Sequence, residues 1–223
     1  MSAARNAPAE PGASSYVSRG GLKLEHALDA FGIAATGRRA LDAGASTGGF
    51  TDCLLRRGAA RVIAVDVAYG ELAWTLRNDE RVRVVERTNI RTLDLTAIGE
   101  APVEIVAADL AFISLRAVRD ALLAAATPGA DLVLLVKPQF EAPRSAVERG
   151  GVVRDPAVWE ASMRAVAAAY AEAGWTVKDA APSPLTGPAG NREFFLHLRR
   201  DGDAAEASSH DRDPIARAVR DAP

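Results

Sequence analysis

The sequence predicts an α/β fold built on a mostly parallel, seven-stranded sheet with helices on both faces. Three observations indicate this fold. Short apolar runs alternate with segments of helical periodicity, as expected of parallel strands joined by helices. A glycine-rich turn, GASTGG, follows the first apolar run closely. Several later runs are followed directly by a charged residue, and the ends of parallel strands meet at one edge of a sheet.

Helices and strands are expected to alternate along the whole ordered chain. The first helix is predicted to begin with Ser18 as its N-cap and to end at Gly32. The strands are expected at 40–41, 61–66, 82–85, 103–108, 131–136, 175–177 and 194–198. The helices between them are expected at 50–55, at 73–77, in the Ala- and Leu-rich segment up to 126, and at 156–170. Residues 141–155 form a long polar loop, and loops of that length are usually functional or disordered.

Three regions differ in composition. Residues 1–15 are rich in Ala, Pro, Gly and Ser without periodicity, so we expect a disordered leader. Residues 16–199 carry all the predicted elements and form one domain of ordinary size. Residues 200–223 are charged and Ala-rich, and we expect a disordered tail.

Composition limits the possible functions. The net charge is -2, and the four arginines and six acidic residues from Arg200 onward account for it, so residues 16–199 are neutral. A stand-alone nucleic-acid-binding protein normally has a net basic footprint, which is absent here. The single cysteine, Cys53, fits a reducing compartment, and the three histidines show no metal-ligand spacing. With no signal peptide and no apolar run long enough to span a membrane, the sequence predicts a cytoplasmic protein without a bound metal.

The glycine-rich turn allows three interpretations. Strand, glycine turn and helix bring backbone N–H groups to a nucleotide-like cofactor. A dinucleotide fingerprint needs a second glycine where Ser46 stands, so the seat for a pyrophosphate is impaired. S-adenosylmethionine has no phosphate and tolerates that serine. The turn therefore favours a methyltransferase over a nicotinamide or flavin enzyme, and over a turn that binds no ligand.

Acidic residues follow three of the predicted strands. Asp42 follows the first, Asp66 ends the second, and Asp109 follows the fourth. Asp66 comes 24 residues after Asp42, close to the ~20-residue offset of a ribose-binding carboxylate. We expect these acids and the Thr88–Ile90 turn to surround one crevice, with Tyr69 either covering a flat ring or lying on the surface.

Two lysines and a glutamate complete the set of candidate residues. Lys23 lies beside the apolar stripe of the first helix, where a solvated helix lysine is the simplest interpretation. Lys137 follows the apolar fifth strand, and Pro138 ends that strand. Glu193 stands at the entrance to the last strand.

In order and context, Lys23, Asp109, Lys137 and Glu193 resemble the Lys-Asp-Lys-Glu tetrad of the FtsJ-like RNA ribose 2′-O-methyltransferases. The closer resemblance, from about Tyr16 to Arg199, is to the TlyA family. It is carried by the blocks SRGGLKLEHAL, LDAGASTGGFTDCLL, VDVAYGELAW, ERTNIR, ADLAFISL, LLVKPQFE, GGVVRDP and SPLTGPAGNREFFLHL.

The resemblance implies a Rossmann-like class I methyltransferase that uses S-adenosyl-L-methionine and methylates cytidine 2′-hydroxyls in ribosomal RNA. The residues that it implies for cofactor binding surround the glycine turn and the strand ends; they are Gly44, Ser46, Thr47, Gly48, Gly49, Phe50, Asp66, Tyr69, Asn89 and Asp109. TlyA proteins usually begin with a small RNA-binding domain, whereas residues 1–15 stand there in this sequence. We therefore expect a methyltransferase domain without that RNA-binding domain, which acts on RNA within a ribosomal subunit and has a partner protein in the domain's place.

The chemistry assigns a role to each member of the tetrad. A ribose hydroxyl is a poor nucleophile, so a base or a positive field must help it lose its proton. We expect Lys137 to be that base or steering group, with Lys23, Asp109 and Glu193 positioning it and the ribose. The alternative is a non-catalytic RNA- or ribosome-binding factor that keeps the fold, although such a module has no need of the tetrad.

Overall fold

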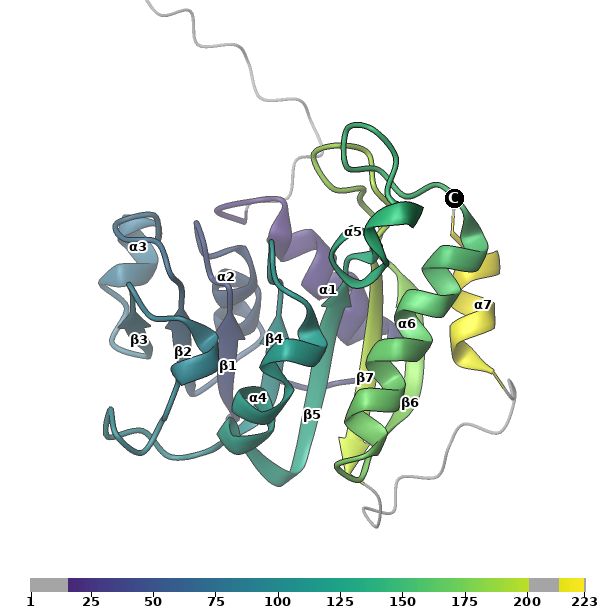
Figure 1. Ribbon diagram of the computed structural model, residues 1–223. Coiled ribbons are helices and arrows are strands. Elements are labelled where there is room, and N and C mark those ends of the chain that lie inside the picture. The colour runs from purple at the N-terminus through teal and green to yellow at the C-terminus, as the bar shows by residue number, and fades with distance from the viewer. Residues whose placement is uncertain (1–15, 201–212, 223) are drawn as a thin grey trace, which may run out of the picture.

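The computed structural model describes residues 16–200 and 213–222; the predicted leader at 1–15 lies outside this range. A seven-stranded sheet in the order β3-β2-β1-β4-β5-β7-β6 forms its centre (Figure 1). The strands are β1 (Arg39–Ala43), β2 (Arg61–Val65), β3 (Val82–Val85), β4 (Val103–Ala108), β5 (Ala126–Val136), β6 (Trp175–Pro182) and β7 (Phe194–Arg200). Only β7 runs antiparallel, to both β5 and β6. The predicted fold class and all seven strands are confirmed.

Helices cover both faces of the sheet. The α-helices are α1 (Gly20–Ala30), α2 (Gly49–Arg56), α3 (Trp74–Arg77), α4 (Arg119–Ala125), α5 (Pro138–Glu141), α6 (Pro156–Ala171) and α7 (Pro214–Arg220). Three short 3₁₀ helices, η1 (Ile90–Thr92), η2 (Leu115–Val118) and η3 (Arg144–Ala146), lie between them. Along β5, Leu132 and Leu134 join the core under α4, α6 and α7, whereas Val133 joins the core under α1, α2 and α3. Side chains therefore alternate between two apolar layers, as in any strand buried on both faces.

The start of α1 differs from the prediction. Arg19 is the N-cap, and Ser18 contributes its backbone oxygen, which accepts a hydrogen bond from Gly21 N, rather than a side-chain cap. A Cβ at Gly21 would lie 2.3 Å from the ring of Tyr16, and one at Gly49 would lie 2.3 Å from Ser18 Oγ. The glycines therefore allow α1 and α2 to meet at their first turns, which places Lys23 beside the glycine turn.

The predicted disordered tail is wrong for its last part. Residues 214–220 form α7, which begins with the Asp213 side chain accepting a hydrogen bond from Ala216 N. Ile215 and Ala218 are buried against the core, and Arg217 forms an ion pair with Asp179 of β6. The Asp-Pro start and the i, i+3 spacing of Ile215 and Ala218 are a helix signal within a charged segment. Residues 201–212 lie outside the described range.

The final strands are longer than predicted. β6 and β7 pair antiparallel over their whole lengths, from Trp175 opposite Arg200 to Pro182 opposite Phe194. This pairing extends both strands past the apolar runs from which the sequence predicts them. No helix in the described part of the chain is both long and apolar enough to cross a membrane.

Candidate active site

The glycine turn brings the ends of β1 and β4 into close contact. Gly44 has a φ of +91°, and a Cβ at this position would lie 2.4 Å from the backbone oxygen of Asp109. Gly48 has a φ of +99°, and a Cβ there would lie 2.3 Å from the side chain of Leu76. Both positions thus require glycine for backbone conformation and for packing. Asp109 is consequently held directly beside the turn.

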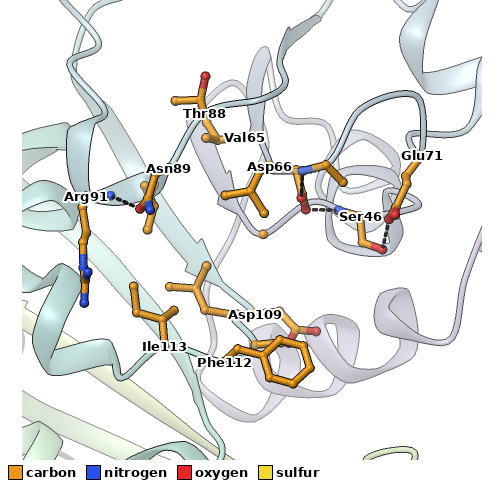
Figure 2. Close-up of a pocket in the computed structure, with 16 residues that line it drawn as sticks. Ser46, Val65, Asp66, Glu71, Thr88, Asn89, Arg91, Asp109, Phe112 and Ile113 are labelled. Carbon is orange, nitrogen blue, oxygen red and sulfur yellow. Dashed lines mark hydrogen bonds between the residues drawn. The ribbon is translucent and has the colours of Figure 1, made fainter.

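A cavity of about 590 Å³ opens beside this turn, at the C-terminal ends of β1, β2 and β4 (Figure 2). The carboxylate of Asp66 stands at its wall, where Oδ2 accepts a hydrogen bond from Ser46 N at 2.8 Å and Oδ1 accepts one from Ala68 N at 2.8 Å. Val65, Ile90 and other apolar side chains share the rest of the wall with polar residues such as Thr88 and Arg91. A wall of apolar surface with a few placed polar groups is the usual pattern of a small-molecule site.

Five of the predicted cofactor residues line this cavity: Gly44, Ser46, Asp66, Asn89 and Asp109. Asn89 also caps η1, since its side-chain oxygen accepts a hydrogen bond from Arg91 N at 3.0 Å. Thr47, Gly49 and Phe50 line a second cavity instead.

Two predicted cofactor residues line neither cavity. Gly48 faces Leu72 and Leu76. Tyr69 is 67% exposed, and the guanidinium of Arg87 lies over its ring at 4.1 Å. Of the two interpretations of Tyr69, the surface tyrosine is therefore the one that the structure shows.

Several lining residues were missed by the sequence analysis. Glu71 lines the cavity, and its Oε2 accepts a hydrogen bond from Ser46 Oγ at 3.2 Å. Leu110 and Ile113 form an apolar wall after β4. Their position directly after Asp109 could have predicted this, because residues that follow the end of a strand border any crevice at that edge of the sheet.

The second cavity, about 210 Å³ in volume, adjoins the first and shares Gly44, Ser46 and Asp109 with it. Lys23 of α1 also lines it, and Thr186 and Pro188 close it from the loop before β7. Two cavities that share a wall can hold two molecules in contact, which a group transfer between bound molecules needs.

The four tetrad residues form two ion pairs. Lys23 Nζ lies 2.6 Å from Glu193 Oε2, and both side chains are nearly buried. Lys137 Nζ lies 2.6 Å from Asp109 Oδ1 at the ends of β5 and β4. Since Lys23 and Asp109 both line the smaller cavity, one member of each pair borders it.

The choice of lysine at these two positions is informative. The chain has three lysines against 24 arginines, and two of the three are Lys23 and Lys137. Arginine keeps its proton in proteins, whereas a lysine can lose one when its environment favours the neutral amine. Among the described residues, no group of three or more His, Cys, Asp or Glu side chains could hold a metal ion.

Asp42, at the end of β1, is an acid buried below the site. The pKa of its carboxyl is raised to about 7, mainly by burial and also by the nearby negative charges of Asp109 and Asp66, which together outweigh the lowering effect of the hydrogen bond from the Thr51 hydroxyl. That hydroxyl donates to Oδ2 at 2.6 Å, whereas Oδ1 has no hydrogen-bond partner in the described structure. These contacts fit a carboxyl that is protonated below neutral pH.

Asp42→Asn is expected to change how stability depends on pH. Between its ordinary pKa of 3.8 and about 7, Asp42 is protonated in the folded protein and ionised in the unfolded chain. The unfolded state then binds fewer protons, so this carboxyl lowers the free energy of unfolding as pH rises, by up to about 1.4 kcal/mol per pH unit. Denaturant unfolding from pH 4 to 8 should show this slope in the wild type and in the control Asp120→Asn, but not in Asp42→Asn. Equal slopes in all three proteins would contradict the assignment.

Comparison with known proteins shows to which family the chain belongs. The FtsJ-like methyltransferase profile matches residues 16–200, the whole sheet and both ion pairs included. The chain belongs to the FtsJ-like methyltransferase family. It is 54% identical over 208 residues to the 16S/23S rRNA (cytidine-2'-O)-methyltransferase TlyA of Mycobacterium tuberculosis, an alignment that covers 93% of this chain and 77% of that protein.

Two further proteins extend the comparison. The 23S rRNA (cytidine-2'-O)-methyltransferase TlyA of Campylobacter jejuni is 35% identical over 184 residues, which are 82% of this chain and 70% of that protein. A solved structure of a hemolysin candidate from Streptococcus thermophilus superposes with a TM-score of 0.85 and 39% identity, over 95% of this chain and 77% of that one. The chain is therefore similar to these proteins over most of its length.

Proposed function

We propose that the protein transfers a methyl group from S-adenosyl-L-methionine to a ribose 2′-hydroxyl, most simply of a cytidine in ribosomal RNA. The observation that carries the proposal is that two lysine–carboxylate pairs each place one member, Lys23 or Asp109, on the wall of a small cavity that adjoins a nucleoside-sized one. Support for the substrate comes from the 54% identical relative, whose name specifies cytidine 2′-O-methylation in 16S and 23S rRNA. A cytoplasmic location follows from the proposal, because ribosomal subunits are there.

The residues of the larger cavity support the binding of this cofactor. The Asp66 carboxylate would accept hydrogen bonds from ribose hydroxyls, and Val65, Ile90 and Ile113 offer apolar surface to a purine ring. At the other end, Gly44 and Ser46 border both cavities, so a ligand that passes the turn reaches the acceptor side. When bound, the cofactor supplies an electrophilic methyl group on sulfur.

In this proposal the two lysines act on the ribose, and the two acids hold the lysines in place. Lys137 takes the proton of the 2′-hydroxyl or stabilises the charge that develops on its oxygen, while Asp109 orients the amine from 2.6 Å. Lys23 is fixed by Glu193 and presents a positive charge to the same cavity. Holding the hydroxyl at attack distance is worth up to ~7–11 kcal/mol of the barrier.

The proposal is tested by methyl transfer to RNA. Ribosomal subunits from a strain that lacks this modification would be incubated with tritium-labelled cofactor and the protein, and the labelled nucleotide would be mapped. A 2′-O-methylcytidine supports the proposal, whereas a base-methylated product overturns the reaction class. Binding to subunits without any transfer favours the alternative, a non-catalytic ribosome-binding factor. Efficient methylation of subunits by the protein alone would contradict the predicted partner protein.

RNA delivery is expected to depend on arginines near the acceptor cavity. Arg144, Arg149 and Arg154 are exposed on the segment that follows Lys137, and only Arg154 approaches an acid there, Glu148 at 3.5 Å. Replacing all three with glutamine should lower kcat/KM about tenfold or more and reduce the slope of log activity against log salt by about 2–3, because each phosphate contact contributes about one. Cofactor affinity should not change.

The matched control removes the same charge elsewhere on the surface. Arg83, Arg200 and Arg220 are exposed and lie outside the 141–155 segment. Their replacement should leave both kcat/KM and the salt slope close to wild type. Equal effects of the two triple variants would show that the RNA site is not localised at the loop.

A further inference from the structure

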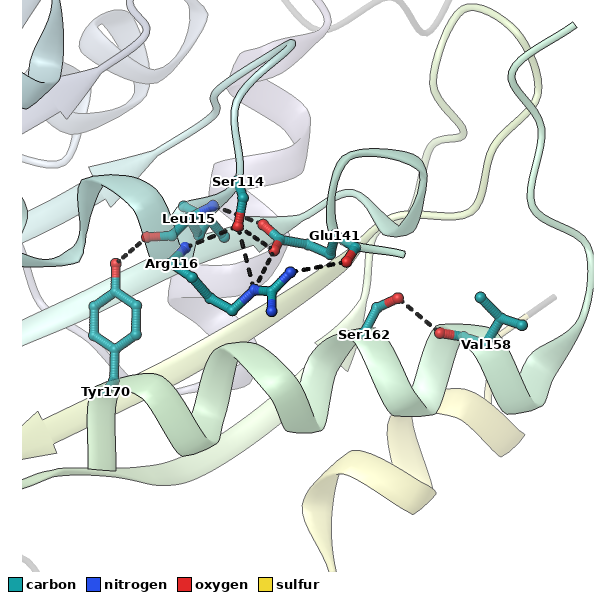
Figure 3. Close-up of polar contacts among 7 residues, drawn as sticks. All are labelled: Ser114, Leu115, Arg116, Glu141, Val158, Ser162 and Tyr170. Atoms are coloured by element: carbon teal, nitrogen blue, oxygen red, sulfur yellow. Dashed lines mark hydrogen bonds and ion pairs between the residues drawn. The ribbon is translucent and has the colours of Figure 1, made fainter. Parts of the chain in front are cut away.

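Glu141, at the end of α5, is a buried carboxylate to which the site described above gives no role. Its side chain is 1% exposed. Ser114 Oγ donates to its Oε2 at 2.5 Å, and Leu115 N donates to its Oε1 at 2.6 Å (Figure 3). Arg116 binds it twice, through Nε to Oε2 at 3.2 Å and through Nη2 to the Glu141 backbone oxygen at 3.0 Å. A buried charge with this many donors fixes the segments that supply them.

These donors all come from the end of one loop. The loop begins at Asp109, runs past Leu110 and Ile113 on the wall of the larger cavity, and ends at the start of η2. Glu141 itself lies four residues after Lys137, and the two are joined by the short helix α5. Glu141 therefore connects the far end of the Asp109 loop to the segment that carries Lys137.

The two segments are linked at three places along their length. At one end Lys137 pairs with Asp109 at 2.6 Å. In the middle, the rings of Phe112 and Phe140 lie 5.3 Å apart. At the other end stands the Glu141 cluster, which is supported from α6 by the hydroxyl of Tyr170, a donor to the backbone oxygen of Leu115 at 3.2 Å (Figure 3). Phe112 has a φ of +64°, so the loop is held in a backbone conformation that non-glycine residues rarely adopt.

We propose that Glu141 is a positioning residue, which clamps the Asp109–Arg116 loop to the Lys137–Glu141 segment and so sets both the Lys137–Asp109 pair and the wall of the cofactor cavity. Its effect on catalysis rests on the proposed methyl transfer, whereas the clamp itself does not. A carboxylate suits this place because it offers only acceptors, and every group that faces it is a donor. Glutamine has the same shape, but its NH2 group would face a donor in either orientation: the Ser114 hydroxyl and the Arg116 guanidinium in one, and the Leu115 amide in the other.

Glu141→Gln tests the proposal with two independent measurements. In the free protein, hydrogen exchange should accelerate about tenfold or more at the Leu115 amide, which loses the constraint of the ionic cluster. In the methyl-transfer assay, kcat should fall about 10- to 100-fold at a temperature where the variant is folded, since small misplacements of reacting groups have effects of that size. Cofactor affinity, measured by calorimetry, should weaken several-fold because Leu110 and Ile113 lose their fixed position.

Glu100→Gln is the matched control. Glu100 is also a nearly buried glutamate. It is paired with Arg39 and Arg61, at the N-terminal ends of β1 and β2, far from the strand ends that border the cavities. If Glu141 only contributed stability, the free energy of unfolding would fall by a similar amount in both variants. Both would then keep the wild-type kcat and cofactor affinity, and that result would overturn the proposal. Unchanged exchange at Leu115 in Glu141→Gln would also overturn it. Should the wild type transfer no methyl group, the proposed function fails, while exchange and cofactor binding still decide whether the clamp exists.

Discussion

Lys137→Ala is expected to abolish methyl transfer while leaving cofactor affinity within a few-fold of the wild type. Lys137 Nζ lies 2.6 Å from Asp109, which borders both cavities, and Lys137 itself lines neither, so its loss should leave the wall of the larger cavity intact. General-base groups contribute ~10²–10⁴-fold to rate, so kcat should fall by that factor. Single-turnover transfer to ribosomal subunits and calorimetry with the cofactor measure the two quantities separately.

Two further lysine variants define what Lys137 does. Lys137→Arg keeps a positive charge but cannot accept a proton at neutral pH, so it should be as inactive as Lys137→Ala if Lys137 is the base. Substantial activity in the arginine variant would instead assign Lys137 the role of stabilising charge on the ribose oxygen. Lys178→Ala, at the remaining lysine of the chain, should behave as wild type. Turnover retained in Lys137→Ala would remove the tetrad assignment altogether.

The polar residues at the strand ends could be predicted from the sequence, because in a parallel sheet the end of each strand can be located from its own apolar run. Asp42, Asp66, Asp109 and Lys137 each follow a short apolar run, and parallel strands place such ends at one edge. The prediction of each strand therefore also predicted where the residue at its end lies. The prediction of Glu193 also needed the resemblance to the FtsJ-like tetrad. Glu193 precedes the antiparallel β7 and therefore reaches the same edge from the opposite direction.

The pairing of the tetrad could not be predicted from the sequence. Lys23 and Glu193 are 170 residues apart, and nothing local indicates that they meet rather than Lys23 and Asp109. Their contact depends on the close approach of α1 to the glycine turn, which Gly21 and Gly49 permit. Glu141 was missed for a similar reason, since its partners lie 25 to 27 residues earlier in the chain.

The position of Tyr69 shows the limit of arguing from proximity in sequence. Tyr69 follows Asp66 by three residues, but the loop turns its ring away to stack with Arg87, a residue with a φ of +53°. Glu71, two residues further on, faces the cavity instead. In an irregular loop the direction of a side chain depends on backbone torsions that periodicity does not encode.

Asp66→Ala is expected to weaken S-adenosyl-L-methionine binding by roughly ten- to a hundredfold, the effect of losing about 1.5–3 kcal/mol of charge-assisted hydrogen bonds. Each Asp66 oxygen accepts one backbone N–H, from Ser46 and from Ala68, which holds the carboxylate at the cavity wall. An ionised carboxylate can accept more than one hydrogen bond at each oxygen, so both oxygens remain able to receive ribose hydroxyls.

The substitution would also release Ser46 N, and Ser46 has a φ of +46°, so a disturbed glycine turn could weaken binding without any contact to the ribose. Calorimetry with the cofactor and with an analogue that lacks both ribose hydroxyls separates the two causes. If Asp66 binds the ribose, Asp66→Ala loses affinity for the cofactor but little for the analogue, which has no hydroxyls to lose. An equal loss for both ligands would assign Asp66 to the turn alone, and unchanged affinity in a folded variant would remove it from the site. Glu71→Gln is the control, since Glu71 lines the same cavity but contacts the turn only through the Ser46 hydroxyl; its affinity for the cofactor should stay within about threefold of the wild type.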